Sequence, residues 1–200
     1  MSPLTVPSEE STMKYRSFLK VAAVVLAAVV WVRPAAAQQA GTITVSAFGQ
    51  FSFFEDATTL SETPAAGIGI GASYFVINNL AVELSGAWVP TELAEQGGDD
   101  VDLYPLRALA AYHFPVSGDV VPIIGGGYTR LEYSDGIDES DNALTGLLGV
   151  KVYFSDRVAF RLDGMVDYVP SPFNEDQGVG SHLNAALTAG VSWDVGGRGR

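Results

Sequence analysis

The sequence contains no cysteine, few charged residues and no apolar run long enough to form a transmembrane helix. Without cysteine there is no disulfide framework, so the fold must be stabilised by packing and backbone pairing. Only 17% of the 200 residues are charged whereas 48% are hydrophobic, which is an apolar composition for a soluble domain of this size. Basic residues are scarce, because 11 Lys and Arg stand against 23 Asp and Glu for a net charge of -12. Such a chain would repel the phosphates of nucleic acid, which excludes nucleic acid as a partner.

The first 37 residues have the features of a signal peptide. Lys14, Arg16 and Lys20 form a basic front, and the apolar stretch Val21–Val32 of about a dozen residues follows it. Ala35–Ala37 then supplies the small residues of a cleavage site. The alternative, a retained membrane anchor, is disfavoured because the apolar stretch is too short to span a bilayer.

Residues 1–12 fit a signal peptide poorly, because Glu9 and Glu10 precede the basic region. We therefore expect translation to begin at Met13. Cleavage after Ala37 would leave an exported mature chain that begins at Gln38.

The stretch from Ala143 to Tyr168 predicts a β-hairpin. Every second residue is apolar, aromatic or glycine on both sides of the short segment Ser155–Arg157, and the alternate residues are mainly polar or charged. Two such strands joined by a minimal turn are the pattern of an antiparallel hairpin with one apolar and one polar face.

The same period of two predicts six further strands, eight in total. Their approximate ranges are 42–53, 66–77, 80–88, 106–114, 121–132, 143–154, 158–168 and 182–194. In the range 121–132 the apolar face is assigned to Val121, Ile123, Gly125, Gly127, Thr129 and Leu131, opposed by Arg130 and Glu132. With this assignment, no charge falls on the apolar face of any strand.

The connections alternate between short and long. The longer ones, at 54–63, 90–101, 134–142 and 169–180, contain many Asp and Glu but no Lys or Arg. One end of the molecule is therefore expected to carry only short turns, and the other to carry long loops whose carboxylates form an acidic rim. Eight antiparallel strands of this pattern should close into a barrel, because an open sheet would leave two unpaired edges.

Periodicity alone leaves two orientations of the barrel open. If the apolar face points inward, the protein is a secreted lipocalin-like barrel with a pocket for a small apolar ligand. If it points outward, the protein is a transmembrane β-barrel with a polar lumen. Aromatic residues near the strand ends, among them Trp88, Tyr112, Phe160 and Trp193, favour the membrane barrel because aromatic girdles mark the two membrane interfaces.

The polar faces carry charges of both signs, which could pair across the narrow lumen of an eight-stranded barrel. We predict a structural polar network in the lumen, formed by Glu83, Arg107, Arg130, Glu132, Lys151, Arg161 and Asp163. Such a network could form a gated polar pore or a closed, salt-bridged plug. The narrow lumen favours the closed plug.

Two segments resemble a known family. Val121–Gly127 and Val158–Asp163, together with the exported precursor and the alternating connections, look like the small outer-membrane β-barrels typified by the transmembrane domain of outer membrane protein A. The resemblance covers essentially the whole mature chain, 38–195, and rests on patterns rather than single residues. It implies insertion into the bacterial outer membrane by the barrel-assembly machinery, with both termini in the periplasm and the long loops outside.

The end of the chain departs from the family pattern. Barrels of this family usually finish at a terminal aromatic residue, whereas here Trp193 is followed by two further residues and by the Gly/Arg tail 196–200. Either the assembly signal tolerates an internal position, or the tail is a flexible linker to a peptidoglycan-binding domain beyond Arg200.

The sequence gives little sign of catalysis or metal binding. The only histidines, His113 and His182, are expected at opposite ends of the barrel, and neither has a partner suited to activating a nucleophile. The acidic segment Asp135–Asp141 lacks the ligand spacing of a calcium loop. We therefore expect no enzyme activity, no catalytic residues, no cofactor and no metal site.

The function expected from the sequence is that of a monomeric structural barrel whose acidic loops contribute to envelope integrity or surface contact. Its partners would be outer-membrane lipid and lipopolysaccharide, with divalent cations bridging carboxylates to lipid phosphates. The alternatives are the secreted binding barrel and a small polar pore.

Overall fold

The computed structural model describes residues 38–54, 60, 64–92, 100–115, 118–134, 139–172 and 180–195. These residues contain no helix long and apolar enough to cross a bilayer. Their strands are β1 (Ile43–Phe53), β2 (Ala65–Ile77), β3 (Leu80–Glu92), β4 (Asp100–His113), β5 (Val120–Ser134), β6 (Ser140–Tyr153), β7 (Val158–Val169) and β8 (His182–Asp194).

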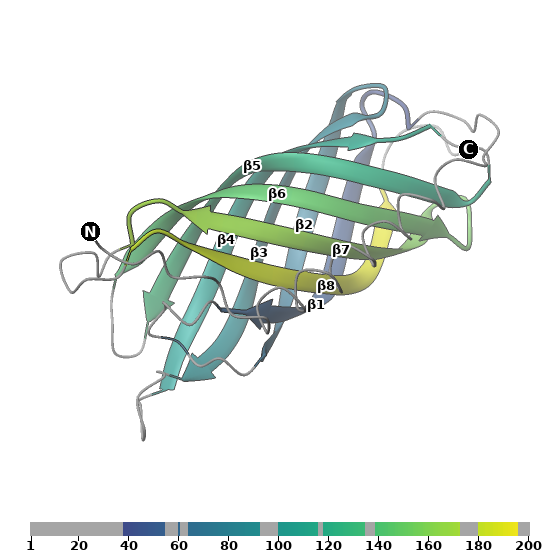
Figure 1. Ribbon diagram of the computed structural model, residues 1–200. Coiled ribbons are helices and arrows are strands. Elements are labelled where there is room, and N and C mark those ends of the chain that lie inside the picture. Colours follow the sequence, from purple (N-terminus) through teal and green to yellow (C-terminus); the bar gives the residue numbers. More distant parts are fainter. Residues whose placement is uncertain are drawn as a thin grey trace, which may run out of the picture. The chain divides into compact units, whose positions relative to one another are not determined.

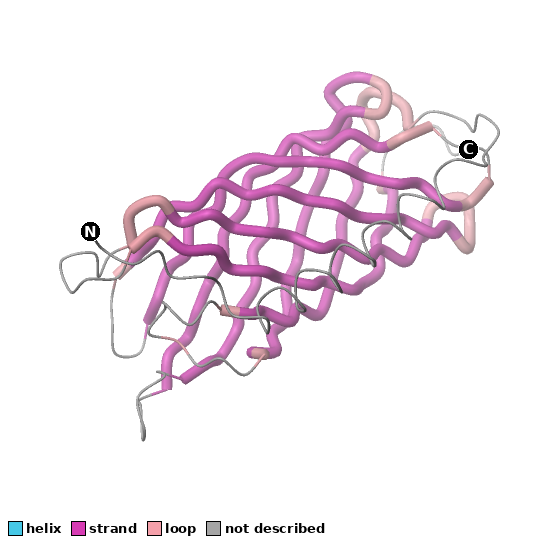
Figure 2. The backbone as a smooth tube through the Cα atoms, in the orientation of Figure 1, coloured by secondary structure: helices cyan, strands magenta, loops and turns pink. Residues whose placement is uncertain are grey.

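The strands form one closed antiparallel barrel. Each pairs with the next along the chain, and β8 pairs with β1 from Thr44 opposite Asp194 to Phe53 opposite Ala185 (Figure 1). At this seam the Thr44 hydroxyl donates a 2.6 Å hydrogen bond to Asp194 Oδ1. The smooth backbone trace in Figure 2 shows the strands running side by side around the wall. The predicted eight-stranded up-and-down topology is confirmed, and closure removes the unpaired edges that an open sheet would have.

Short connections gather at one end of the barrel, which we call the turn end. The connection between β2 and β3 is the pair Asn78-Asn79, and Asn79 adopts a left-handed φ of 68° that asparagine tolerates in tight turns. Between β6 and β7, Ser155 Oγ accepts a 3.1 Å hydrogen bond from the Val158 backbone N–H. The longer connections lie at the opposite end, the loop end, and most of their residues lie outside the described ranges.

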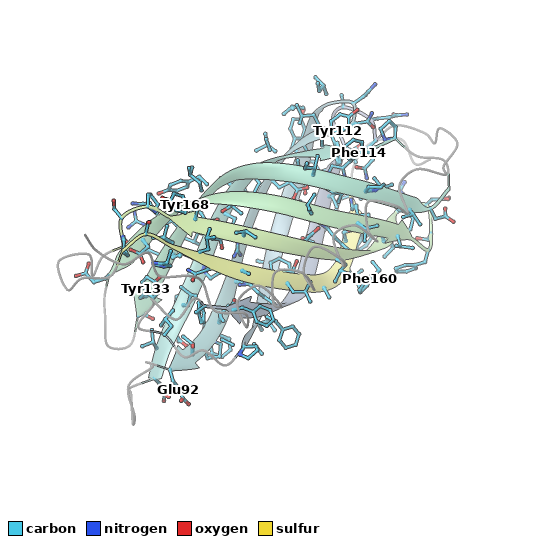
Figure 3. All side chains as sticks on the ribbon, viewed as in Figure 1. Glu92, Tyr112, Phe114, Tyr133, Phe160 and Tyr168 are labelled. Atoms are coloured by element: carbon cyan, nitrogen blue, oxygen red, sulfur yellow. The ribbon has the colours of Figure 1, made fainter. Side chains whose placement is uncertain are left out.

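Side chains alternate between the outside and the inside of the barrel, and the apolar set faces outward. On β6, Leu148 is 50% exposed whereas Lys151, three residues further along, is 1% exposed. Phe160 on the neighbouring strand β7 is 43% exposed, and Arg161, which follows it, is the residue opposite Lys151. Figure 3 shows that Tyr112, Phe114 and Phe160 lie toward one end of the strands and Tyr168 toward the other. These exposed rings form the two aromatic girdles expected where a barrel meets the membrane interfaces.

The predicted orientation of strand β5 is wrong. Val121, Ile123 and Leu131 point inward and are buried, whereas Arg130 and Glu132 point outward, with half of the Arg130 side chain exposed. The outward position of the two charges is physically acceptable because they lie beyond Tyr128 toward the loop end, where the wall leaves the apolar part of a membrane.

Much of the interior is filled by apolar side chains, which the sequence reading does not anticipate. The inward ring of Phe48 lies between Gly69 and Gly190 on the two neighbouring strands, and a Cβ at either glycine would come within 2.6 Å of Phe48 atoms. At the loop end a contiguous group of buried residues fills the barrel, and we call it the loop-end cluster. Its members are Leu60, Ala65, Ala87, Val89, Val101, Leu103, Leu131, Tyr133, Ala143 and Val169.

Candidate functional site

The most prominent polar feature of the interior is an ion cluster that crosses the lumen near the turn end. The Arg161 guanidinium on β7 donates two hydrogen bonds of 3.0 and 2.8 Å to the two carboxylate oxygens of Glu83 on β3. Its Nε also donates a 2.7 Å hydrogen bond to Asp163 Oδ2. Because β3 and β7 stand on opposite sides of an eight-stranded ring, this contact spans the interior.

The Arg161 cluster, formed by Glu83, Arg161 and Asp163, extends toward the turn end through residues of four other strands, β2, β4, β6 and β8. His113 Nε2 lies 3.2 Å from Glu83 Oε1, and the His113 ring packs edge-on against Phe75. The Lys151 ammonium lies 3.8 Å from Asp194 Oδ1 and 5.5 Å from the centre of the Tyr153 ring. Tyr153 in turn donates a 2.9 Å hydrogen bond to Asp194 Oδ2. The last residue of β8 is thereby tied to β6 as well as to β1.

A second ionic group lies further toward the loop end. Arg107 on β4 donates 3.1 Å hydrogen bonds to Gln50 Oε1 on β1 and to Asp167 Oδ2 on β7. Thr145 donates a 2.6 Å hydrogen bond to the other oxygen of Asp167, and Thr129 is hydrogen-bonded to Thr145. All five side chains are buried, so this group also joins distant strands through the interior.

Five of the seven residues predicted for the lumen network are inside the barrel, namely Glu83, Arg107, Lys151, Arg161 and Asp163. Arg130 and Glu132 are not part of it, and they form an ion pair with each other on the outer surface. The sequence reading missed Gln50, His113, Asp167 and Asp194 as members of the two ionic groups. All four residues occupy the polar face of the period of two, and this position is the signal that could have identified them.

The interior leaves little free space. The described residues surround a cavity of about 40 Å³ beside the Arg161 cluster, lined among others by Ser73, Ser85, Glu83, Asp163 and Thr188. A cavity of this size holds a few water molecules at most. The arrangement can therefore hold the wall strands together, because charges removed from water are stabilised when they are paired and hydrogen-bonded.

The two histidines are far apart, as expected. His113 lies at the turn end of β4, whereas His182 is the first residue of β8 at the loop end, where its Nδ1 lies 3.3 Å from the Gly180 carbonyl oxygen. No group of three or more His, Asp or Glu side chains in the described part of the chain could hold a metal ion. In the acidic segment Asp135–Asp141, which lacks the ligand spacing of a calcium loop, residues 135–138 lie outside the described residues.

Only part of the predicted acidic rim is described. Glu92 and Asp100 face each other across β3 and β4 at the loop end and both are exposed, as is Glu139. Asp141 instead points inward, is 2% exposed, and accepts a 3.0 Å hydrogen bond from the Tyr133 hydroxyl. The described part of the rim is therefore acidic, although the Asp141 carboxylate is buried in the interior.

An apolar outer wall, two aromatic girdles and a buried ionic interior define a transmembrane β-barrel. The model of the outer membrane protein beta-barrel domain family matches residues 22–194. The chain belongs to this family of outer-membrane β-barrels. Among curated proteins, the sequence comparison finds no significant match.

Solved structures show the same fold. The chain is similar to Neisserial surface protein A, with a TM-score of 0.57 and 21% identity over 76% of this chain and 96% of that chain. It is also similar to OprG from Pseudomonas aeruginosa, with a TM-score of 0.56 and 14% identity over 80% and 98% of the two chains. Ail of Yersinia pestis, in complex with the heparin analogue sucrose octasulfate, gives a TM-score of 0.50 and 17% identity over 78% and 99%. At these identities the likeness concerns the fold.

Proposed function

We propose that this protein is a structural barrel of the bacterial outer membrane that contributes to envelope integrity or surface contact and has no enzyme activity. The observation that carries the proposal is the filled interior. Ionic groups around Arg161 and Arg107 and the loop-end cluster occupy the described barrel from one end to the other. A barrel with an apolar wall, aromatic girdles and a filled interior is suited to anchoring loops in a membrane rather than to transporting solutes.

The alternatives from the sequence find less support. A secreted lipocalin-like barrel needs an inward apolar face, but residues such as Ile70 and Leu148 face outward and are at least half exposed. A polar pore needs a continuous aqueous path, whereas ionic groups and buried apolar side chains occupy the described lumen. The cavity beside the Arg161 cluster is only about 40 Å³. An enzyme needs a nucleophile and base in contact, and the two histidines are at opposite ends.

The acidic loop end suggests which surface partners suit the protein. Exposed carboxylates such as Glu92, Asp100 and Glu139 would bind divalent cations that bridge to lipopolysaccharide phosphates, and would repel polyanions. Ail was solved with a heparin analogue, a polyanion. We propose that this chain differs from Ail in that respect because its loops are acidic.

The expectations about biogenesis belong to the same proposal. We propose that the signal peptide is cleaved after Ala37, that the barrel-assembly machinery inserts the mature chain, and that the barrel is a monomer with both termini in the periplasm.

Planar bilayers and a deletion strain together test the proposed function. The folded wild-type protein should give no conductance steps, and the deletion should make cells more sensitive to detergents and large antibiotics. Wild-type gene in trans should restore resistance. Discrete steps from the folded wild type would refute the structural role and support a pore, and a deletion strain with an unchanged envelope barrier and unchanged surface contacts would also refute it.

A further inference from the structure

The residues that precede β1 fold back onto the turn end of the barrel. The Gly41 N–H donates a 2.8 Å hydrogen bond to the Phe75 carbonyl oxygen, and the Phe75 N–H donates one of 3.0 Å to the Thr42 carbonyl oxygen. Gln38 pairs with the β2–β3 turn in both directions. Its backbone N–H donates a 3.1 Å hydrogen bond to Asn79 Oδ1, and its carbonyl oxygen accepts one of 2.9 Å from the Asn79 N–H. The backbone of Gln38 is therefore fixed beside β2 and β3.

The side chain of Gln38 is bound by a different wall of the barrel. Its Nε2 donates a hydrogen bond to the Tyr153 hydroxyl on β6, and β6 stands opposite β2 in the eight-stranded ring. Tyr153 is only 5% exposed, and its hydroxyl donates its own proton to Asp194 Oδ2 at 2.9 Å. A tyrosine hydroxyl can accept one hydrogen bond while it donates another. The two nitrogen atoms of Gln38 are thus bonded to two different elements of the barrel.

These contacts concern a residue with its own chemistry at a chain terminus. Cleavage after Ala37, on which this inference rests, is part of the proposed function and makes Gln38 the first residue of the mature chain. A free N-terminal glutamine can cyclise to pyroglutamate. The neutral α-amino nitrogen attacks the side-chain carbonyl carbon Cδ, a new C–N bond forms, and the Cδ–Nε2 bond breaks. Ammonia leaves and carries away a proton of the amine, so the lactam is lighter by one ammonia.

We propose that the folded turn end keeps Gln38 in its open-chain form, so that cyclisation takes place in unfolded chains and not in folded barrels. Ring closure requires Cδ to fold back onto the α-nitrogen, whereas the bond to Tyr153 holds the amide inside the lumen. The bond to Asn79 Oδ1 engages a proton of the α-nitrogen, which must lose one to attack. Cyclisation would also remove Nε2, and with it the link to β6. Gln38 is therefore a modification site whose state depends on whether the barrel has folded.

Mass spectrometry of the chain that begins at Gln38 tests the inference. A site-specific protease releases this chain with its native first residue, and samples are incubated at neutral pH either folded in detergent micelles or unfolded in urea. Circular dichroism identifies the folded samples. Ammonia should be lost at least about tenfold more slowly from the folded protein, because two hydrogen bonds must open first. Equal rates in the two states would overturn the inference.

Two tyrosine variants locate the protection. Tyr153→Phe removes the acceptor of Gln38 Nε2, and the folded variant should cyclise about fivefold faster than the wild type, the factor that corresponds to one net hydrogen bond. The matched control Tyr104→Phe removes a hydroxyl that is bonded to Asp102 in the loop-end half of β4, and it should leave the rate unchanged. If Tyr153→Phe fails to fold, Asn79→Gly replaces it, because glycine accepts the left-handed φ of 68° and lacks the acceptor of the α-nitrogen. A wild-type rate in the folded variant would contradict the inference.

The mass of the protein isolated from outer membranes separates the inference from the cleavage on which it rests. The expected chain begins with an unmodified Gln38. Pyroglutamate at that position would overturn the inference and leave the cleavage confirmed, whereas a different first residue would contradict both.

Discussion

At the scale of single residues, Arg161 is the side chain on which the interior depends most directly. Its guanidinium makes three hydrogen bonds of 2.7 to 3.0 Å to Glu83 and Asp163, and only 11% of its side chain is exposed. Removing one member of a buried ion group costs more than the group contributes in net terms, because the remaining charges are left without compensation.

Replacing Arg161 with alanine should therefore lower the free energy of unfolding by about 3 to 5 kcal/mol. The matched control is Arg157→Ala, because Arg157 lies in the exposed turn between β6 and β7, and its loss should change stability by no more than about 0.5 kcal/mol. Urea unfolding of both variants in lipid vesicles measures the difference. Equal stability of the two variants would show that the Arg161 contacts contribute nothing to the fold.

At the scale of elements, β5 shows how a strand can be assigned the wrong face. Its turn-end half is apolar on both faces, since Val121 and Ile123 alternate with Pro122 and Ile124, and three glycines follow. The only charges, Arg130 and Glu132, lie so close to the loop end that either orientation is allowed there. The partner strands decide the orientation, because the backbone pairing of β4 and β6 fixes which β5 residues point inward.

The orientation of β5 can be measured because the wild-type chain has no cysteine. Single cysteines at positions 123 and 124, labelled with the same fluorophore, should respond differently to brominated lipid chains. The label at Ile124 should be quenched because Ile124 is 47% exposed on the outer wall, whereas Ile123 is 2% exposed in the interior. Stronger quenching at position 123 would restore the orientation that the sequence alone suggested.

At the scale of the whole molecule, the apolar outer wall decides that the protein folds in lipid or detergent rather than in water. Ile68, Ile70, Leu84 and Leu144 are each more than half exposed, and they belong to a continuous apolar wall. Soluble monomers rarely expose apolar patches of this extent, because such surface drives association in water. The interior, by contrast, carries the buried ionic groups.

The chain beginning at Gln38 should therefore refold to a β-rich monomer in detergent micelles and aggregate in plain buffer. Circular dichroism and light scattering in the two conditions measure the outcome. A soluble, β-rich monomer without micelles would mean that the apolar wall does not face lipid.

The period of two in the sequence was sufficient to determine the number of strands and their antiparallel order. The outward direction of the apolar face, which is right for seven strands, also needed the aromatic residues near the strand ends. Those properties depend on residues close in sequence: alternation sets the two faces, as between Leu148 and Lys151, and tight turns such as Asn78-Asn79 join neighbours. The lumen position of five charged residues could be predicted from the sequence, namely Glu83, Arg107, Lys151, Arg161 and Asp163. Once the apolar face of a strand meets lipid, its charged face has to point into the lumen.

Only the tertiary structure decided which charges meet. Glu83 and Arg161 are 78 residues apart and belong to opposite walls, so their contact depends on closure and register rather than on local pattern. The same holds for the loop-end cluster. Leu60, Val101 and Val169 fall in segments that the sequence predicts as connections, and only the folded barrel brings them together with residues of other strands. Periodicity determines the face of each residue, but only the closed register determines which residues share a layer.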